Sequence, residues 1–134
     1  MVLTRPALPS TNVHAIDDQH HVLFQNIARL EQALATGQGG DGLPQIIREL
    51  AEYAGQHGPT EERLMEEYGY PLREIHTMEH EQFFVRLREI DRMIAEGHST
   101  AAVQALNRLR AWLERHIMDW DARLGDFLNR RGVA

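Results

Sequence analysis

Apolar residues recur every three or four positions along four stretches of this 134-residue chain. Such spacing places them on one face of an α-helix and predicts four amphipathic helices. The pattern is interrupted by "GQGGDG" at 37–42, by "YGYP" at 68–71 and by Gly97, which are signals for turns. No strand pattern and no internal repeat is present. We therefore expect an all-α fold, an up-down-up-down antiparallel four-helix bundle with short loops.

The bounds of the expected domain follow from proline and capping signals. The first 15 residues contain two prolines and predict an extended N-terminal arm, ahead of a bundle domain at 16–134. The first helix is expected to begin near Asp17 or Asp18, either of which can cap it, and Ser99 is expected to cap the fourth. The expected core stripes are Leu23, Phe24, Ile27, Leu30 and Leu34; Ile46, Ile47, Leu50, Tyr53, Ala54, Leu64 and Met65; Ile75, Phe83, Phe84, Leu87, Ile90 and Ile94; and Leu106, Leu109, Leu113, Ile117, Trp120, Leu124 and Phe127.

Composition narrows the classes of function. The chain has no cysteine, so any metal site must use histidine and carboxylate ligands, which suit iron, manganese or zinc. The net charge is −6 with both signs interspersed, and no basic patch favours nucleic acid as a partner. No apolar run reaches the length of a membrane span, and the N-terminus lacks the apolar core of a signal peptide. We expect a cytoplasmic protein that is a monomer.

Five of the eight histidines continue the apolar stripes, with at least one in each predicted helix. They lie near the start of the first and third helices and beyond the middle of the second and fourth, so antiparallel helices bring them to one level. Burying several imidazoles and carboxylates without partners costs several kcal/mol each, a cost that a metal removes. This favours a metal centre over a metal-free polar core. The residues that point inward are His20, His57, His76, His80 and His116, together with Glu61.

The fourth helix offers two aspartates close to His116. Asp119 lies three residues after the histidine and Asp121 lies five after it. Five residues of a regular α-helix turn about 500°, which leaves Asp121 about 140° away from His116 and makes Asp119 the better local choice. A π-bulge would bring Asp121 into line instead. Spacing alone does not choose between them. The remaining histidines, His14, His21 and His98, lie off the stripes and are expected to be solvated.

The strings "IDDQH", "H…EE.LM", "GYP", "H…H" and "WLERHI…D", in this order, resemble the bacterial hemerythrin family over residues 16 to about 128. The resemblance implies a non-haem di-iron centre with an oxo or hydroxo bridge. It implies that one iron is held by His76, His80 and His116, that the other is held by His20 and His57, and that Glu61 and Asp121 bridge the two. It thereby favours Asp121 over Asp119 and implies a π-bulge near Trp120.

The resemblance also implies a function, because this ligand set leaves one coordination position open on the two-histidine iron. Dioxygen binds there reversibly in the family, for storage, delivery or sensing. The alternative is a di-iron redox enzyme of peroxidase, NO-handling or ferroxidase type, for which Tyr53 and Tyr68 are candidate proton donors. A third reading is a helical interaction module without metal.

The sequence departs from the family after the second histidine. The family usually has phenylalanine there, as a wall of the oxygen pocket, whereas this chain has Gly58 followed by Pro59. Pro59 has no N–H and would clash with the carbonyl of Gly55, so we expect a kink or break between Gly55 and Pro59. Loss of the aromatic wall is expected to open the oxygen pocket and to speed irreversible oxidation.

Overall fold

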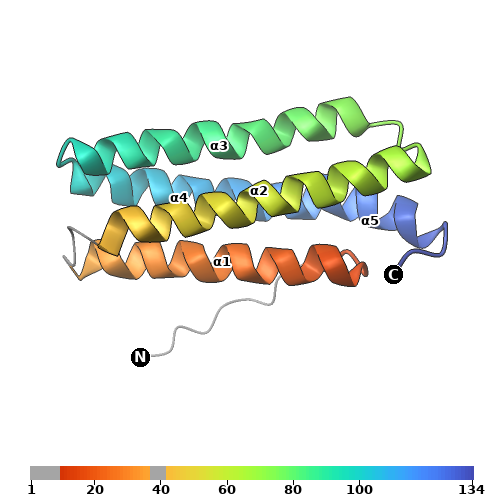
Figure 1. Ribbon diagram of the computed structural model, residues 1–134, viewed down its shortest axis with the longest axis horizontal. Helices are drawn as coiled ribbons and strands as arrows, with labels where there is room; N and C mark the ends of the chain where they lie inside the picture. Colours follow the sequence, from red (N-terminus) through yellow and green to blue (C-terminus); the bar gives the residue numbers. More distant parts are fainter. Residues whose placement is uncertain (1–9, 37–41) are drawn as a thin grey trace.

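The computed structural model describes residues 10–36 and 42–134, whose regular secondary structure is entirely helical. Four long helices, α1 (His14–Ala35), α2 (Gly42–Tyr68), α3 (Arg73–Ala95) and α4 (Ser99–His116), lie side by side (Figure 1). The π-helical turn η1 (Ile117–Asp121) and α5 (Ala122–Asn129) continue α4. The expected four-helix bundle is confirmed, with α1 packed on α2 and α4, and α3 packed on the same two helices. Of the expected arm at 1–15, residues 1–9 lie outside the described residues, and its last two residues already belong to α1. Residues 37–41 of the expected turn also lie outside them.

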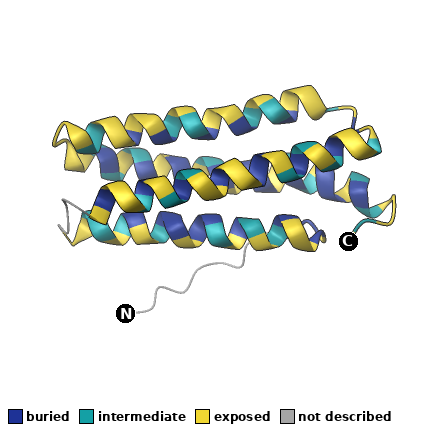
Figure 2. Ribbon diagram, in the orientation of Figure 1, coloured by how far each residue is buried: buried dark blue, intermediate teal, exposed yellow. Residues whose placement is uncertain are grey.

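Each helix buries one stripe and exposes the opposite face to solvent (Figure 2). The predicted stripes are buried or half-buried except at Tyr53 and Ile75, which are 40% and 50% exposed. Each of these two precedes an inward-facing residue, Ala54 or His76, and one residue along a helix is a rotation of about 100°. The prediction of core positions is therefore wrong at Tyr53 and Ile75. No helix in the described segments has an apolar run long enough to cross a membrane.

The apolar interior is divided into two clusters. The larger one extends along most of the four long helices, from Leu23 to Leu30 on α1 and from Leu106 on α4 to Ile117 at the start of η1. The smaller one closes one end of the bundle and consists of Val13, Ile16, Met65, Tyr70, Leu124 and Leu128. On every helix the inward-facing polar residues predicted from the sequence lie between the two clusters. The fold thus holds one polar layer between two apolar cores.

The first helix begins earlier than its capping signals predict. It starts at His14 after Val13, and no side chain caps it, so the prediction that Asp17 or Asp18 is the cap is wrong. The Asp17 carboxylate instead accepts hydrogen bonds of 2.8 Å from both the backbone N–H and the hydroxyl of Thr11. It also accepts one of 2.6 Å from Ser10. Asp17 therefore ties the preceding segment to the helix rather than starting it. The prediction that Ser99 caps the fourth helix is wrong as well, because α4 begins at Ser99 itself and its N-cap, His98, makes no side-chain capping hydrogen bond.

Pro59 lies inside α2, which is continuous from Gly42 to Tyr68. Of the expected kink or break between Gly55 and Pro59, the break is wrong, because the helix continues through the proline. Pro59 and Gly55 both lie on the exposed face of the helix, so water can bind the Gly55 carbonyl that lacks a donor. The opposite face is fixed by burial, with Ala54, His57 and Glu61 pointing into the interior. Packing on this side holds the helix together across the proline.

Residues 10–13 pack closely against α5, which yields a first prediction. A Cβ at Gly125 would lie 2.5 Å from the carbonyl oxygen of Thr11, a backbone atom that cannot move aside alone. Gly125→Ala should therefore lower the free energy of unfolding by about 1–3 kcal/mol, measured by denaturant titration. Gly55→Ala is the control, since its Cβ has nothing within 4 Å and helix propensity favours it by up to about 1 kcal/mol. Equal stability of the two variants would contradict this packing.

Candidate metal centre

Seven buried polar side chains meet in the layer between the two apolar clusters. They come from every helix of the bundle, and none is more than 8% exposed. They are His20 of α1, His57 and Glu61 of α2, His76 and His80 of α3, His116 of α4 and Asp121 of η1. The structure therefore brings together all seven residues that the resemblance implies.

The two oxygens of Glu61 face different histidines. Oε2 lies 2.8 Å from Nε2 of His57 and 3.7 Å from Nε2 of His20. Oε1 lies 2.8 Å from Nε2 of His76 and 3.0 Å from Nε2 of His80. The carboxylate thus lies between one pair of histidines on α1 and α2 and another pair on α3.

The two carboxylate oxygens of Asp121 also face different histidines. Its Oδ2 lies 2.7 Å from Nε2 of His20, whereas its Oδ1 lies 2.9 Å from Nε2 of His76 and 3.1 Å from Nε2 of His116. Two groups of donors result, one with three histidines and one with two, and both share Glu61 and Asp121. Within each group one ligand atom from every residue lies within 4.8 Å of the others.

The π-helical turn explains why Asp121, and not Asp119, lies in this layer. The N–H of Ala122 donates to the carbonyl of Ile117, five residues earlier, as the implied π-bulge requires. The wider turn brings Asp121 round to the side of His116, where it is fully buried, and leaves Asp119 exposed. The π-bulge expected near Trp120 is confirmed.

Several nitrogen and oxygen atoms of the polar layer have no well-formed hydrogen bond, which shows whether the layer could hold a metal ion. Nε2 of His20, His57 and His116 and both oxygens of Asp121 are buried and lack a well-formed hydrogen bond, although they face one another closely. Unpaired buried polar atoms cost about 1–3 kcal/mol each, so their convergence on common centres needs a compensating partner. Imidazole nitrogens and carboxylate oxygens together suit iron, zinc or manganese. The donor set therefore fits metal ions.

The contacts between histidines and carboxylates in the layer also shift the pKa values of these groups. Burial lowers the pKa of His20 and of His76, but the close approach and negative charge of Asp121 and Glu61 outweigh it and raise both pKa values to about 9. The pKa of His80 rises for the same reasons, mainly through Glu61. Burial raises the pKa of Glu61, yet the surrounding histidines bring it well below its ordinary value, and they lower that of Asp121 as well. The facing carboxylates therefore favour protonation of His20, His76 and His80 in this layer.

Two histidines have partners at the second ring nitrogen, and the sequence analysis missed both partners. Nδ1 of His57 lies 3.3 Å from Oε1 of Gln19, and Nδ1 of His80 lies 3.3 Å from Oε2 of Glu62. Each partner directly adjoins a predicted ligand in the chain, Gln19 beside His20 and Glu62 beside Glu61. That adjacency is the signal that could have found them. An acceptor on Nδ1 keeps the proton there and leaves Nε2 free to bind a metal.

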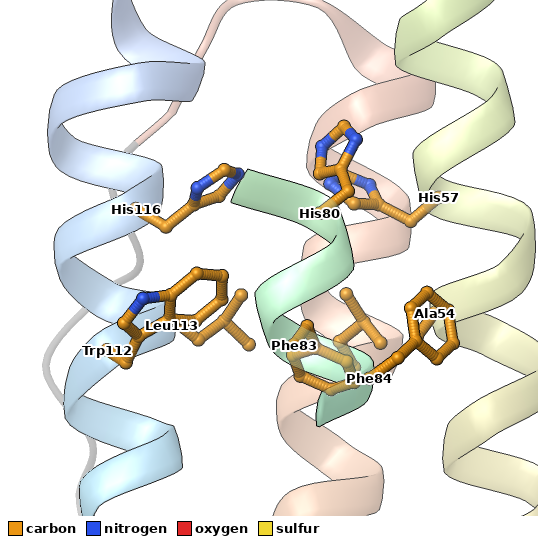
Figure 3. A pocket seen from close by; sticks show the side chains of 9 residues that line it. Ala54, His57, His80, Phe83, Phe84, Trp112, Leu113 and His116 are labelled. Carbon is orange, nitrogen blue, oxygen red and sulfur yellow. The ribbon is translucent and has the colours of Figure 1, made fainter. Parts of the chain in front are cut away.

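A cavity of about 20 Å³ adjoins the polar layer. Three histidines form one side of it and apolar side chains form the other (Figure 3). Its lining residues are Leu23, Ala54, His57, His80, Phe83, Phe84, Trp112, Leu113 and His116. Gly58 is not among them, and a Cβ at this position would face Glu62 and His80 instead. The structure therefore does not support the expectation that Gly58 opens this pocket.

The remaining titratable candidates lie away from the layer. His14, His21 and His98 are exposed, as expected, and His98 lies 3.7 Å from Glu96. Tyr53 borders a surface groove between α1 and α2, and Tyr68 packs on the smaller apolar cluster. Neither tyrosine lines the cavity. The predicted division into inward and solvated histidines is therefore confirmed.

The pKa shifts predict how the metal-free protein responds to pH. Raised histidine pKa values add stability that is complete below about pH 6.5 and is lost as the pH rises towards 9. The lowered pKa values of Glu61 and Asp121 add stability that is lost below about pH 4.5. The melting temperature should peak between about pH 5 and 6.5 and fall by at least about 5 °C at pH 9. A flat profile between pH 6 and 9 would contradict this electrostatic account.

Comparisons with known proteins agree with the geometry. The family model described as "Hemerythrin HHE cation binding domain" matches residues 11–128. A bacteriohemerythrin of Methylococcus capsulatus is 27% identical over 119 residues, which cover 89% of this chain and 90% of the relative. A bacteriohemerythrin of Stenotrophomonas maltophilia is 30% identical over 114 residues, 85% of this chain and 73% of the relative. No solved structure shows a significant match. The family match spans nearly the whole bundle and includes all seven inward residues, and the chain belongs to the hemerythrin family.

Proposed function

We propose that this protein binds dioxygen reversibly at a non-haem di-iron centre. The proposed ligands are His76, His80 and His116 for one iron and His20 and His57 for the other, with Glu61 and Asp121 bridging. One observation carries the proposal: each carboxylate presents one oxygen to each histidine group. A carboxylate placed in this way suits two cations side by side, each with its own histidines.

The protein's own part is to hold the donors and to exclude water. When bound, a pair of ferrous ions supplies the electrons for reversible dioxygen binding. Burial of all seven donors between two apolar clusters keeps bulk water and external acids away from them. Gln19 and Glu62 keep Nε2 of His57 and His80 turned towards the centre.

The small cavity suits dioxygen as the ligand. Its volume of about 20 Å³ holds a molecule little larger than water, and most of its lining is aliphatic or aromatic. The cavity touches His57 of the two-histidine group as well as His80 and His116 of the three-histidine group. It therefore reaches the two-histidine group, on which the family leaves a coordination position open. We therefore propose this cavity as the dioxygen pocket.

The alternative, a di-iron redox enzyme, needs a proton donor beside the ligand. Apart from the three histidines, Trp112 is the one lining residue whose side chain carries a polar atom, and its ring stacks on His116. No carboxyl or hydroxyl group lines the cavity. The two tyrosines considered as donors lie elsewhere. These observations favour storage, delivery or sensing of dioxygen over its consumption, as does the name of the relatives.

Optical spectroscopy tests the proposed function. The iron-loaded protein, reduced under argon and then exposed to air, should develop a visible absorption band that fades when argon is restored. Because acids and water are excluded, several cycles should be possible without added reductant. A band that decays to the oxidised protein and returns only with reductant would support the redox enzyme instead.

The two aspartates of the fourth helix provide a matched pair of variants. Asp121→Ala removes a proposed bridge, so iron bound per chain, measured by metal analysis after desalting, should fall from two towards one or none. Asp119→Ala removes the same charge from an exposed position two residues away and should leave two irons bound. Equal iron content in the two variants would contradict the assignment of Asp121.

A further inference from the structure

Gly58 and Glu62 lie one turn apart on α2, beside the metal-facing pair His57 and Glu61. Their position prompts a question, since glycine in a helix interior costs about 1 kcal/mol relative to alanine. Gly58 is buried, and its φ does not require glycine. A reason for the missing side chain must therefore lie in the space that it leaves.

That space is occupied by the carboxylate of Glu62. A Cβ built at Gly58 would lie 3.0 Å from Oε2 of Glu62 and 3.6 Å from Nδ1 of His80. The same Oε2 lies 3.3 Å from Nδ1 of His80. A side chain at position 58 would displace this oxygen by a few tenths of an ångström. The contact with Nδ1 of His80 is already near the upper limit of a hydrogen bond, so it has little room to lengthen.

We propose that Gly58 admits Glu62 to His80, and that Glu62 is a positioning residue which fixes the ring of His80 for metal binding. An ionised carboxylate can accept a hydrogen bond but cannot donate one. Its contact with Nδ1 of His80 therefore keeps the proton of the neutral imidazole on Nδ1. The lone pair of Nε2 then faces Glu61 and the three-histidine group. This deepens the proposed function and rests on it, because it concerns how one ligand of that centre is held.

A neutral counterpart exists on the other histidine group. Nε2 of Gln19 donates to the hydroxyl of Thr60 at 3.0 Å, and that hydroxyl donates to the carbonyl of Gln56 at 2.9 Å. The amide oxygen of Gln19 is therefore the end that faces Nδ1 of His57, also at 3.3 Å. In each histidine group, one ring thus has a partner at Nδ1. The partner is the amide of Gln19 for His57 in the two-histidine group and the carboxylate of Glu62 for His80 in the three-histidine group.

The contrast between Glu62 and Glu66 tests the proposal. Glu66 lies one turn further along α2 and is exposed, so Glu66→Ala removes the same charge without the contact. Zinc is the probe, because it accepts these ligands and has no redox chemistry. Glu62→Ala should weaken zinc binding, measured by competition with a chromophoric chelator, by about 10-fold or more. Glu66→Ala should leave it unchanged, and equal affinities would overturn the proposal.

Nitrogen-15 NMR of the zinc-loaded protein separates positioning from a general loss of stability. In wild type the Nδ1–H of His80 should exchange slowly with water, and Glu62→Ala should speed this exchange while that of His57 stays slow. Glu62→Gln should restore most of the protection, because its amide oxygen can accept as Gln19 does. Unchanged exchange at His80 in Glu62→Ala would overturn the proposal even if affinity fell.

Gly58→Ala tests the role of the missing side chain. It should speed exchange at His80 and weaken zinc binding in the wild-type background, but add nothing in the Glu62→Ala background. Additive losses would overturn the role given to Gly58. Suppose that the optical test shows no reversible dioxygen binding, but Glu62→Ala still weakens zinc binding and speeds exchange while Glu66→Ala does not. The proposed function alone would then be refuted. Reversible oxygen binding with Glu62→Ala equal to Glu66→Ala would refute only this inference.

Discussion

The structure depends on the burial of five imidazoles and two carboxylates in one layer of a helical bundle. Removing so many polar groups from water is costly, and apolar packing cannot offset it inside the layer itself. The two clusters above and below supply the packing, and the carboxylates divide their oxygens between the two histidine groups. The carboxylates raise the pKa values of His20 and His76, so protons on these rings are favoured in the metal-free protein, and metal ions would replace them.

The local irregularities of the helices are explained by the same constraint. The π-helical turn after His116 rotates Asp121 into the layer, where a regular helix would present Asp119. Pro59 is accommodated because its face of α2 is exposed and its opposite face is fixed by His57 and Glu61. Gly58 leaves room for Glu62 behind His80. Each departure from ideal helix geometry lies beside a residue of the polar layer.

Much of this arrangement could be predicted from the sequence, because periodicity decides which face of a helix is buried. The stripes predicted the bundle and the inward histidines, but spacing left Asp119 and Asp121 open, since helix geometry alone favours the wrong one. The start of α1 was missed because Asp17 binds Thr11 rather than capping the helix. Gln19 and Glu62 were missed because their contacts cross between helices, and a single sequence does not show which residues meet there.

The measurement that tests the account most directly is an X-ray crystal structure of the iron-loaded protein with anomalous data at the iron edge. The account predicts two anomalous peaks, one beside Nε2 of His76, His80 and His116 and the other beside Nε2 of His20 and His57. Glu61 and Asp121 should each place one carboxylate oxygen beside each of the two peaks. A single peak, or peaks away from these seven side chains, would contradict the central claim that the layer is a two-metal centre.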